Sequence, residues 1–253
     1  MVDGISLGDK RVLVTGASTG IGAATARLLG AAGACVGVHY RQAREAAEAV
    51  ADAIRGAGGQ AHLLAGDLQD DAVRRTLVGD FVRACGGIDI LVNNAGACYG
   101  YEHFASLNEQ SWDLTLTLNA KTPFFLSRDA FADMKPRGWG RIINISSVSQ
   151  KYAGGRSLHY AASKAALDTL TLGFAREGAP HNILVNSIRC GVIATGMHTR
   201  IEGYSDDLFR ERVGKIPLKR AGMPDDIARM ALFLASDHGN FITGEIFTVA
   251  GGD

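Results

Sequence analysis

Short apolar runs, each followed by a longer segment with helical periodicity, recur from one end of this chain to the other. Seven runs rich in β-branched residues predict strands, at 11–15, 34–40, 61–66, 88–93, 141–146, 183–188 and 245–249. Between them, segments such as 41–58 repeat apolar residues at the spacing of an amphipathic helix. Strands that are apolar throughout and separated by crossover helices form a parallel sheet covered on both faces. We therefore expect an α/β fold: a single Rossmann-like, doubly wound domain with a seven-stranded parallel sheet.

The length of the chain suits one sizeable domain. It has 253 residues, of which 47% are hydrophobic, and no internal repeat or Pro/Ser-rich linker divides it. We treat 1–253 as one domain. The segment from about 190 to 217 is the one long stretch without clear regular structure, and such loops are usually functional. We expect a binding loop or lid there, with a short helix at 206–213.

The charge and cysteine content exclude several classes of protein. Basic and acidic residues balance at 26 each, which favours a small-molecule ligand over nucleic acid or a membrane surface. The N-terminal segment lacks the apolar core of a signal peptide, and 28–40 is too short to span a bilayer, so a cytoplasmic protein is expected. Four cysteines without a C-x-x-C pair indicate buried free thiols and no metal site or disulfide framework: Cys35, Cys85, Cys98 and Cys190.

The first predicted strand ends in 15-TGASTGIG-22, which leads directly into a helical pattern. Glycines at such a turn adopt positive φ and let a pyrophosphate approach N–H groups at a helix N-terminus, where the dipole favours negative charge. Gly16, Gly20 and Gly22 are therefore candidate dinucleotide contacts, although tight turns also use glycine for geometry alone. The spacing is G-x-x-x-G-x-G, not the commoner G-x-G-x-x-G.

Tyr160 and Lys164 lie four residues apart in the alanine-rich stretch 159-HYAASKAALDTL-170. Alanine favours a helix, and residues at i and i+4 share one helix face. The two are either an exposed pair worth roughly a few tenths of a kcal/mol or a proton donor beside a tuning charge. Lowering the pKa of a phenol by about three units from about 10 requires about 4 kcal/mol, and a nearby ammonium has the right sign.

Several motifs occur together and in order along the chain. They are T-G-x-x-x-G-I-G at 15–22, N-N-A-G at 93–96, N-I-S-S-V-S at 144–149 and Y-x-x-x-K at 160–164. With the C-terminal segment 241–253, they resemble the motifs of the short-chain dehydrogenase/reductases over nearly the whole chain. The resemblance implies one dinucleotide-binding and catalytic domain that transfers a hydride between a nicotinamide cofactor and a small carbonyl or alcohol substrate.

The resemblance also implies where the cofactor is bound. The matching positions are Gly16, Ser18, Thr19, Gly20, Ile21, Gly22, Tyr40, Arg41, Asp67, Leu68, Asn94, Ala95, Gly96, Tyr160, Lys164, Gly191, Ile193 and Thr195. Two of these assignments have simpler alternatives. Asp67 would serve equally as the N-cap of the helix that follows, and 93–96 as a polar turn.

The end of the second strand reads 39-HYR-41 and carries no acid that would hydrogen-bond a ribose 2′-hydroxyl. Arg41 offers a forked guanidinium suited to a phosphate, unless it is only the solvated first residue of the next helix. The basic residue that many NADP-using relatives carry in the glycine turn is replaced by Thr19. We expect NADP(H) in preference to NAD(H).

A carbonyl reduction needs an acid for the forming alkoxide and a hydrogen-bond donor for its oxygen. The resemblance assigns the first role to Tyr160 and the second to Ser147. It makes Lys164 the ribose ligand and tuning charge and Asn119 the holder of a relay water. Ser146 is the alternative to Ser147, because adjacent serines at a strand end point to opposite sides. Asn119 alone would be interpreted as a buried asparagine that satisfies backbone groups in a helix.

One departure from the family lies in 189-RCGVIATGM-197, where Cys190 replaces the usual proline. We expect it to loosen the turn that seats the nicotinamide and to leave a thiol near the substrate, as a harmless replacement or as a redox group. Substrate identity is expected to depend on 151–159 and 196–217. There Arg156 and His159 are either ligands of an anionic substrate group or ordinary solvated residues.

The expected function is therefore NADP(H)-dependent interconversion of a ketone and a secondary alcohol. One alternative is a non-catalytic dinucleotide-sensing or scaffold protein on the same fold. Another is an enoyl reductase, whose relatives have a longer tyrosine-to-lysine spacing. The helix that starts at Tyr160 and the segment 121–131 resemble helices that form tetramers in the family, so a homotetramer is expected.

Overall fold

The computed structural model describes residues 4–153, 156–201 and 203–253. Seven parallel strands form one sheet in the order β3-β2-β1-β4-β5-β6-β7. Every predicted run overlaps a strand, so the expected sheet is confirmed. The strands are β1 (Arg11–Val14), β2 (Cys35–Tyr40), β3 (Gln60–Ala65), β4 (Ile90–Asn93), β5 (Gly140–Ser147), β6 (Ile183–Cys190) and β7 (Ile246–Val249).

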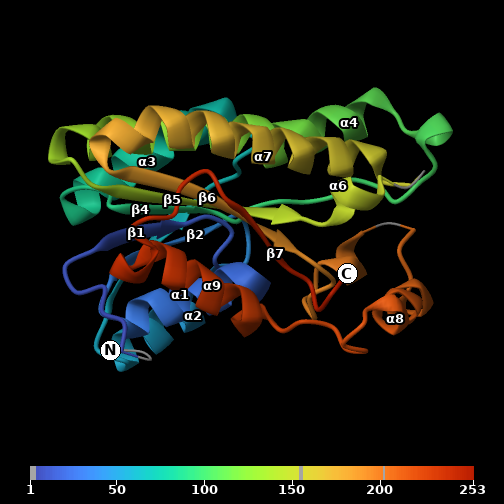
Figure 1. The fold of residues 1–253 in the computed structure, drawn as a ribbon, viewed down its shortest axis with the longest axis horizontal. Helices are drawn as coiled ribbons and strands as arrows, with labels where there is room; N and C mark the ends of the chain where they lie inside the picture. The colour runs from blue at the N-terminus through green and yellow to red at the C-terminus, as the bar shows by residue number, and fades with distance from the viewer. Residues whose placement is uncertain (1–3, 154–155, 202) are drawn as a thin grey trace.

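Helices cover both faces of this sheet, as Figure 1 shows. One face carries α1 (Gly20–Ala31), α2 (Arg44–Gly56) and α9 (Pro224–Ala235), and the other carries α3 (Asp71–Cys85), α5 (Thr122–Met134) and α7 (Leu158–Gly178). The alternation of side chains along β1 serves both layers, since Val12 and Val14 join one buried cluster and Leu13 the other. This two-sided burial explains why the strands are apolar throughout.

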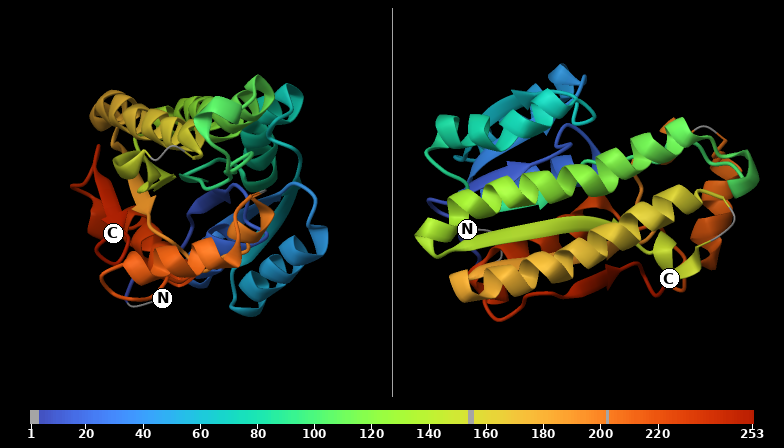
Figure 2. Two further views of the ribbon diagram at one scale, coloured as in Figure 1. Left: turned by 90° about the vertical axis from the view of Figure 1, so that its right-hand side faces the viewer. Right: turned by 90° about the horizontal axis from the view of Figure 1, so that it is seen from above.

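One long helix on the second face is built from three consecutive pieces. It begins with α4 (Glu109–Leu116), passes through a π-helical turn, η2 (Thr117–Lys121), and continues as α5. Seen from above, it runs beside α7 over the sheet (Figure 2). A single π-helical turn inside an α-helix often marks a functional site.

The strands β4 and β5 are held in register by buried amide groups as well as by their backbones. The Asn93 side chain donates from Nδ2 to Oδ1 of Asn144 at 2.8 Å, and Asn144 donates from Nδ2 to Oγ1 of Thr171 on α7 at 2.8 Å. Asn93 therefore lies inside the sheet, and the residues that follow it form the turn at the carboxyl edge.

The carboxyl ends of the strands face α6 (Ser149–Tyr152), the short helix η5 (His198–Arg200) and α8 (Asp206–Lys215), which lie at one end of the molecule (Figures 1 and 2). The expected helix at 206–213 is present as α8, and Ser205 caps it by accepting from the N–H of Leu208 at 3.2 Å. Among the helices described, none is both long and apolar enough to cross a membrane.

Candidate active site

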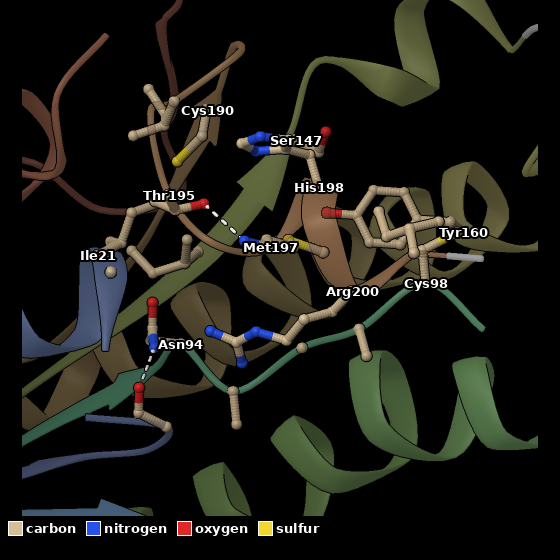
Figure 3. A pocket seen from close by; sticks show the side chains of 18 of the residues that line it. Ile21, Asn94, Cys98, Ser147, Tyr160, Cys190, Thr195, Met197, His198 and Arg200 are labelled. Atoms are coloured by element: carbon tan, nitrogen blue, oxygen red, sulfur yellow. Dashed lines mark hydrogen bonds between the residues drawn. The ribbon is translucent and has the colours of Figure 1, made fainter. Parts of the chain in front are cut away.

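A cavity of about 510 Å³ opens at the carboxyl edge of the sheet, beside β1 and β4, where the order of the strands reverses (Figure 3). In doubly wound folds this is the position where ligands bind. Of the predicted site residues, most line this cavity: Gly16, Ser18, Thr19, Gly20, Ile21, Arg41, Asp67, Leu68, Asn94, Ala95, Gly96, Ser147, Tyr160, Lys164, Gly191, Ile193 and Thr195. Gly22, Tyr40 and Asn119 do not line it.

Two groups of segments bound the cavity. The glycine wall is formed by the turn 15–22 and the ends of β2, β3 and β4 at 39–41, 66–68 and 94–96, in which Gly22 and Tyr40 do not themselves line the cavity. The lid wall consists of residues 197–201 and 204–212, which include η5 and most of α8. Tyr160 and Ser147 lie between the two walls.

The glycine wall is shaped by backbone geometry. Gly16 has φ +62° and Gly20 has φ +58°, conformations that favour glycine. A Cβ on Gly22 would collide with the Gly16 carbonyl oxygen and the Asn94 amide. That amide donates from Nδ2 to the carbonyl oxygens of Thr15 at 2.8 Å and Gly16 at 3.1 Å. Gly22 therefore serves the packing of the turn, not its contact surface.

The N-terminus of α1 meets the glycine wall and fits an anionic group. Gly20 and Ile21 line the cavity, and α1, all of whose residues are described, has no acidic side chain in its first turn. A Cβ on Gly20 would lie 3.2 Å from Cγ2 of Thr195, so the glycine keeps open a cradle between the turn and the segment after β6. N–H groups and dipole at such a terminus suit the pyrophosphate of a dinucleotide.

His39 is a wall residue that the sequence interpretation missed. Its Nδ1 accepts from the Gly16 N–H at 3.1 Å, and its Nε2 lies 3.1 Å from the Gly66 carbonyl oxygen. A neutral imidazole has one acceptor and one donor nitrogen, so Nε2 carries the proton. Burial lowers the pKa of His39 to about 4, which keeps the ring neutral. The residue thus ties the glycine turn to the end of β3.

Of the residues predicted at the ends of β2 and β3, Tyr40 lies in the core, whereas Arg41 and Asp67 line the cavity. Tyr40 packs into the core and is 7% exposed, because successive strand residues point to opposite faces. Arg41 lines the cavity with a half-exposed side chain, 3.9 Å from the Asp67 carboxylate. The alternatives for both charged residues are wrong in detail: α2 begins at Arg44, and Asp70, not Asp67, caps α3.

A second arginine reaches the glycine wall from the lid. Arg200 of η5 donates from Nη2 to Oγ1 of Thr19 at 3.3 Å, and Figure 3 shows its side chain extending across the cavity toward Asn94. Its Nε also donates to the Gly196 carbonyl oxygen at 3.1 Å. The turn position that lacks a basic residue in the sequence therefore lies beside a guanidinium supplied by the lid.

Tyr160 and Lys164 share one face of α7, as predicted, and both line the cavity. The Lys164 Nζ donates to the Ile145 carbonyl oxygen at 2.7 Å and stands 5.7 Å from the centre of the Tyr160 ring. Lys164 is only 4% exposed, so the pair is not the surface contact that was the simpler alternative.

The pKa values of this pair are governed by burial. Burial raises the pKa of Tyr160 above its ordinary value, and the Ser147 hydroxyl acts against this by a hydrogen bond that lowers it. Burial lowers the pKa of Lys164 to about 8, with Cys190 and Asp168 acting in the opposite direction. Desolvation of the phenolate is therefore the largest influence on the pKa of Tyr160 in this cavity.

The two adjacent serines at the end of β5 point to opposite sides. Ser147 lies beside Tyr160, and its Oγ accepts from the Ser149 N–H at 3.1 Å. Ser146 is 3% exposed, and its Oγ donates toward the Lys164 carbonyl oxygen at 3.4 Å, at the inner face of α7. Both serines line the cavity, and Ser147 is the one whose side chain hydrogen-bonds to Tyr160.

Asn119 lies in the π-helical turn, fully buried behind the cavity. Its Nδ2 donates to the Ala97 carbonyl oxygen at 2.8 Å and to Oγ of Ser163 at 3.0 Å, and its Oδ1 accepts from the Ala97 N–H at 3.0 Å. A Cβ on Gly96 would lie 3.1 Å from that Oδ1 and 3.3 Å from the Lys164 Nζ. The side chain therefore holds the turn after β4 against the lysine.

Cys190 does not loosen the chain as expected. It is the last residue of β6 and pairs with Ser147 of β5 and Val249 of β7, so the strand continues where a proline would interrupt its ladder. The carbonyl oxygen of Cys190 accepts from the Val148 N–H at 3.0 Å. Burial raises the pKa of its thiol to about 12, which keeps it protonated and unreactive at neutral pH.

The lid wall is rich in aromatic side chains. The His198 ring stacks on Phe209 with ring centres 4.2 Å apart, and Tyr204 meets Tyr101 edge to face at 5.0 Å. All four line the cavity on the side of Tyr160. Such walls suit a ligand with a flat apolar portion.

The two basic candidates near the start of α7 lie outside the cavity. His159 is fully buried, and its Nε2 lies 3.0 Å from the Tyr99 carbonyl oxygen. Arg156 is exposed and lies 5.7 Å from the ring centre of Tyr101. His159 is thus neither a solvated residue nor a cavity residue; it supports the wall from behind.

Comparison with known proteins agrees with this geometry. Residues 16–253 match the model of a family described as enoyl-(acyl carrier protein) reductase. The 3-oxoacyl-acyl-carrier-protein reductase FabG of Staphylococcus aureus is 36% identical over 243 residues, which cover 96% of this chain and 97% of that protein. Versicolorin reductase 1 of Aspergillus parasiticus is 36% identical over 262 residues, which cover 100% of this chain and 99% of that protein.

A solved structure is similar over the same length. A short-chain dehydrogenase from Burkholderia cenocepacia J2315, crystallised in complex with NADP, matches with a TM-score of 0.90 and 34% identity. The match covers 97% of this chain and 98% of that one. The resemblance stated from the motifs therefore extends to the whole fold.

Proposed function

We propose that this chain, which belongs to the short-chain dehydrogenase/reductase family, interconverts a ketone and a secondary alcohol with NADP(H). One observation carries the proposal. Tyr160 and Ser147 meet at a cavity whose opposite side is the glycine turn and the N-terminus of α1. A proton donor, an oxygen ligand and a pyrophosphate cradle thus open onto one space.

In the reductive direction, the chemistry supplied by a bound nicotinamide is the hydride that reaches the carbonyl carbon. As the carbonyl π electrons move to oxygen, Ser147 donates a hydrogen bond to that oxygen and the Tyr160 O–H gives it a proton. The step leaves a secondary alcohol as the product and Tyr160 as a tyrosinate, which must regain its proton from solvent. The reverse sequence oxidises the alcohol.

Lys164 acts on the tyrosinate rather than on the substrate. Its pKa of about 8 leaves it mostly protonated at neutral pH, so a positive charge lies on the tyrosine side of α7 when the phenolate forms. In a buried site this charge offsets part of the desolvation that raises the pKa of Tyr160. Asn119 holds the neighbouring turn, and we assign it the relay through Lys164 as part of the same proposal.

The preference for NADP(H) is proposed from the charges of the glycine wall. Arg41 provides a half-exposed guanidinium at the end of β2, where an acid would repel a 2′-phosphate. Arg200 adds a second guanidinium beside Thr19, close to the N-terminus of α1. We assign Arg41 to the 2′-phosphate and Arg200 to the pyrophosphate.

The substrate proposed is a ketone carried on or beside a ring. Tyr101, Tyr204, His198 and Phe209 offer flat apolar surface on the Tyr160 side of the cavity. Relatives of this chain are named for reducing versicolorin and 3-oxoacyl groups, so the substrate panel must contain a polycyclic aromatic ketone and a 3-oxoacyl thioester.

The test is NADPH oxidation by the purified chain over that panel, with an enoyl thioester as a third substrate class. We expect turnover with the ring-bearing ketone. Tyr160→Phe should then lose at least about 10³-fold in kcat while it still binds NADPH by fluorescence titration. Near-normal activity in that variant would refute the mechanism. NADPH binding without turnover of any substrate would indicate a dinucleotide sensor, and turnover of the enoyl thioester alone an enoyl reductase.

The proposal includes assembly into a homotetramer. Large apolar side chains are partly exposed on the long helix and on α7: Trp112 at 43%, Phe124 at 39% and Leu172 at 40%. These helices lie side by side on the outer face of the sheet, and a second copy would cover them. Light scattering after size-exclusion chromatography measures the mass directly, and a monomer at micromolar concentration would contradict this part.

A further inference from the structure

Two cysteines that are far apart in the sequence meet at the amino edge of the sheet. Cys35 begins β2 and Cys85 ends α3, and their Sγ atoms lie 3.6 Å apart. His62 of β3 completes the group, since one ligand atom from each of the three residues lies within 4.8 Å of the others. All four cysteines are free thiols as expected, but Cys35 and Cys85 are half-buried, not buried, and lie side by side. The cluster is half-buried and stands at the opposite end of β2 from His39 and the cavity.

The fold brings these three side chains together for reasons visible in the strand register. Gly37 pairs with His62, and Cys35, two residues before Gly37, points to the same face of the sheet. A Cβ on Gly37 would lie 2.6 Å from the ring of Phe81, so that face is the one covered by α3. Cys85 follows Phe81 by one helical turn and so faces the same strands. The geometry of the cluster is thus set by rigid elements, not by loops.

The spacing of the sulfur atoms matches that of a metal site. Two thiolates about 2.3 Å from a tetrahedral Zn²⁺ ion lie about 3.8 Å from each other. The observed 3.6 Å is close to that separation. The half-buried His62 places a ring nitrogen within 4.8 Å of both sulfur atoms.

We propose that Cys35, His62 and Cys85 bind one Zn²⁺ ion, with a water molecule as the fourth ligand. Two thiolates and an imidazole are the ligand types that Zn²⁺ prefers, and a half-buried position gives access to the ion and its water. Arg11 lies beside the site, where its Nη1 donates to the Gly86 carbonyl oxygen at 2.6 Å. Its positive charge lowers the pKa of the Cys85 thiol, which burial raises, although the guanidinium is also paired with the Asp89 carboxylate at 2.6 Å.

The role of the ion follows from what it joins. Among the described strands β3 lies at the edge of the sheet, and the three ligands come from β3, from its neighbour β2 and from α3 above them. A metal bound there cross-links the edge of the sheet to its covering helix. We assign the ion a stabilising role at this edge, separate from the proposed reaction, since about five strand residues, or about 16 Å, separate Cys35 from the cavity end of β2.

The test is a titration of the reduced, metal-free full chain with Co²⁺ as the spectroscopic probe, followed by displacement with Zn²⁺. We expect one equivalent of Co²⁺ with thiolate-to-cobalt charge transfer and the intense visible bands of tetrahedral coordination, and loss of both when Zn²⁺ is added. Zn²⁺ should also raise the melting temperature of the chain. No activity measurement enters this test, so failure of the proposed reaction leaves its result unaffected.

Matched variants locate the site. Cys35→Ser or Cys85→Ser should weaken Co²⁺ binding by more than the roughly 10–100-fold that loss of an outer-shell partner costs, while Cys98→Ser, at a buried thiol elsewhere, should bind normally. Should a serine variant fail to fold, protection of Cys35 and Cys85 from alkylation by Zn²⁺ in the unmodified chain, read by peptide mass spectrometry, answers the same question. Any of three results would overturn the proposal: Co²⁺ binding that is unchanged in both cysteine variants, Co²⁺ spectra typical of octahedral coordination, or a Cys35–Cys85 disulfide that persists in the reduced preparation.

Discussion

The glycine wall and the lid wall enclose the same cavity but hold their shapes in different ways. In the glycine wall, Gly22 leaves no room for a Cβ, and the imidazole of His39 joins two backbone segments. In the lid wall the contacts are between side chains, such as His198 on Phe209. A wall whose shape depends on backbone contacts tolerates few substitutions. A wall whose shape depends on contacts between side chains can be repacked by the exchange of a few residues. The comparison indicates that the proposed cofactor site is fixed by the fold and the proposed substrate site by the lid.

The largest effect is expected where the two walls meet, at the end of β5. Ser147→Ala removes the hydroxyl beside Tyr160 and should lower kcat by about 10²–10³, the usual effect of losing one donor to a developing oxyanion. Ser146→Ala removes a hydroxyl that faces the backbone of α7 and should change kcat less than about threefold. Steady-state kinetics on the best ketone of the panel measures both, and equal losses would show that the two serines do not have separate roles.

The next effect compares a glycine of the glycine wall with one that adjoins the lid wall. Gly22→Ala forces a Cβ against the Gly16 carbonyl oxygen and should lower the free energy of unfolding by about 3 kcal/mol. Gly196→Ala, next to the lid, places its Cβ 3.4 Å from the flexible end of Arg200 and should cost less than about 1 kcal/mol. Urea denaturation of both variants gives the comparison. A lid variant as unstable as the Gly22 variant would remove the distinction between the walls.

His39 makes the stability of the glycine wall depend on pH. Its pKa is about 4 in the folded chain against an ordinary value of 6.5, so between these pH values the unfolded chain binds the proton and the folded chain does not. Stability should therefore fall as the pH falls, by about 2 kcal/mol from this residue between pH 7 and pH 4.5. His39→Gln should lose this part of the pH dependence. The exposed His238→Gln is the control, and it should follow the unmodified chain at both pH values in urea denaturation.

The smallest effect separates the two arginines that reach the proposed cofactor. Arg41→Met should lower kcat/KM for NADPH roughly tenfold and leave that for NADH nearly unchanged, because only the 2′-phosphate loses a partner. Arg200→Met should lower both by a similar factor, because the pyrophosphate is common to the two cofactors. Kinetics with both cofactors at several salt concentrations measures the difference. Equal loss with the two cofactors in the Arg41 variant would reassign it away from the 2′-phosphate.

The features that were predictable from the sequence are those in which local geometry dictates the residue type. The strands were readable because burial on both faces requires continuous apolar runs. The glycine turn was predictable because Gly16 and Gly20 occupy positive φ. The shared helix face of Tyr160 and Lys164 was predictable because the two residues are four apart.

The features that were not predictable depend on contacts between distant segments. Arg200 and Thr19 are 181 residues apart in sequence, and Cys35 and Cys85 are 50 apart. Nothing local marks His39 as a backbone ligand, since an alternating strand offers a histidine to either face with equal ease. Tyr40 was misplaced for the same reason. A signal for His39 did exist in principle, because a polar residue within an apolar strand needs a buried partner.

The π-helical turn that carries Asn119 has a consequence for how this helix tolerates change. A π-helical turn holds one residue more than a regular α-helix of the same path, and each residue turns the helix by about 100°. Deleting one residue from 117–121 would give a more regular helix, but it would rotate either Asn119 away from Ala97 or the apolar face of α5 away from the sheet. Most helices accept insertions and deletions at their ends, but this internal turn does not. The π-helical turn is what allows Asn119 to face Ala97 while the apolar face of α5 faces the sheet.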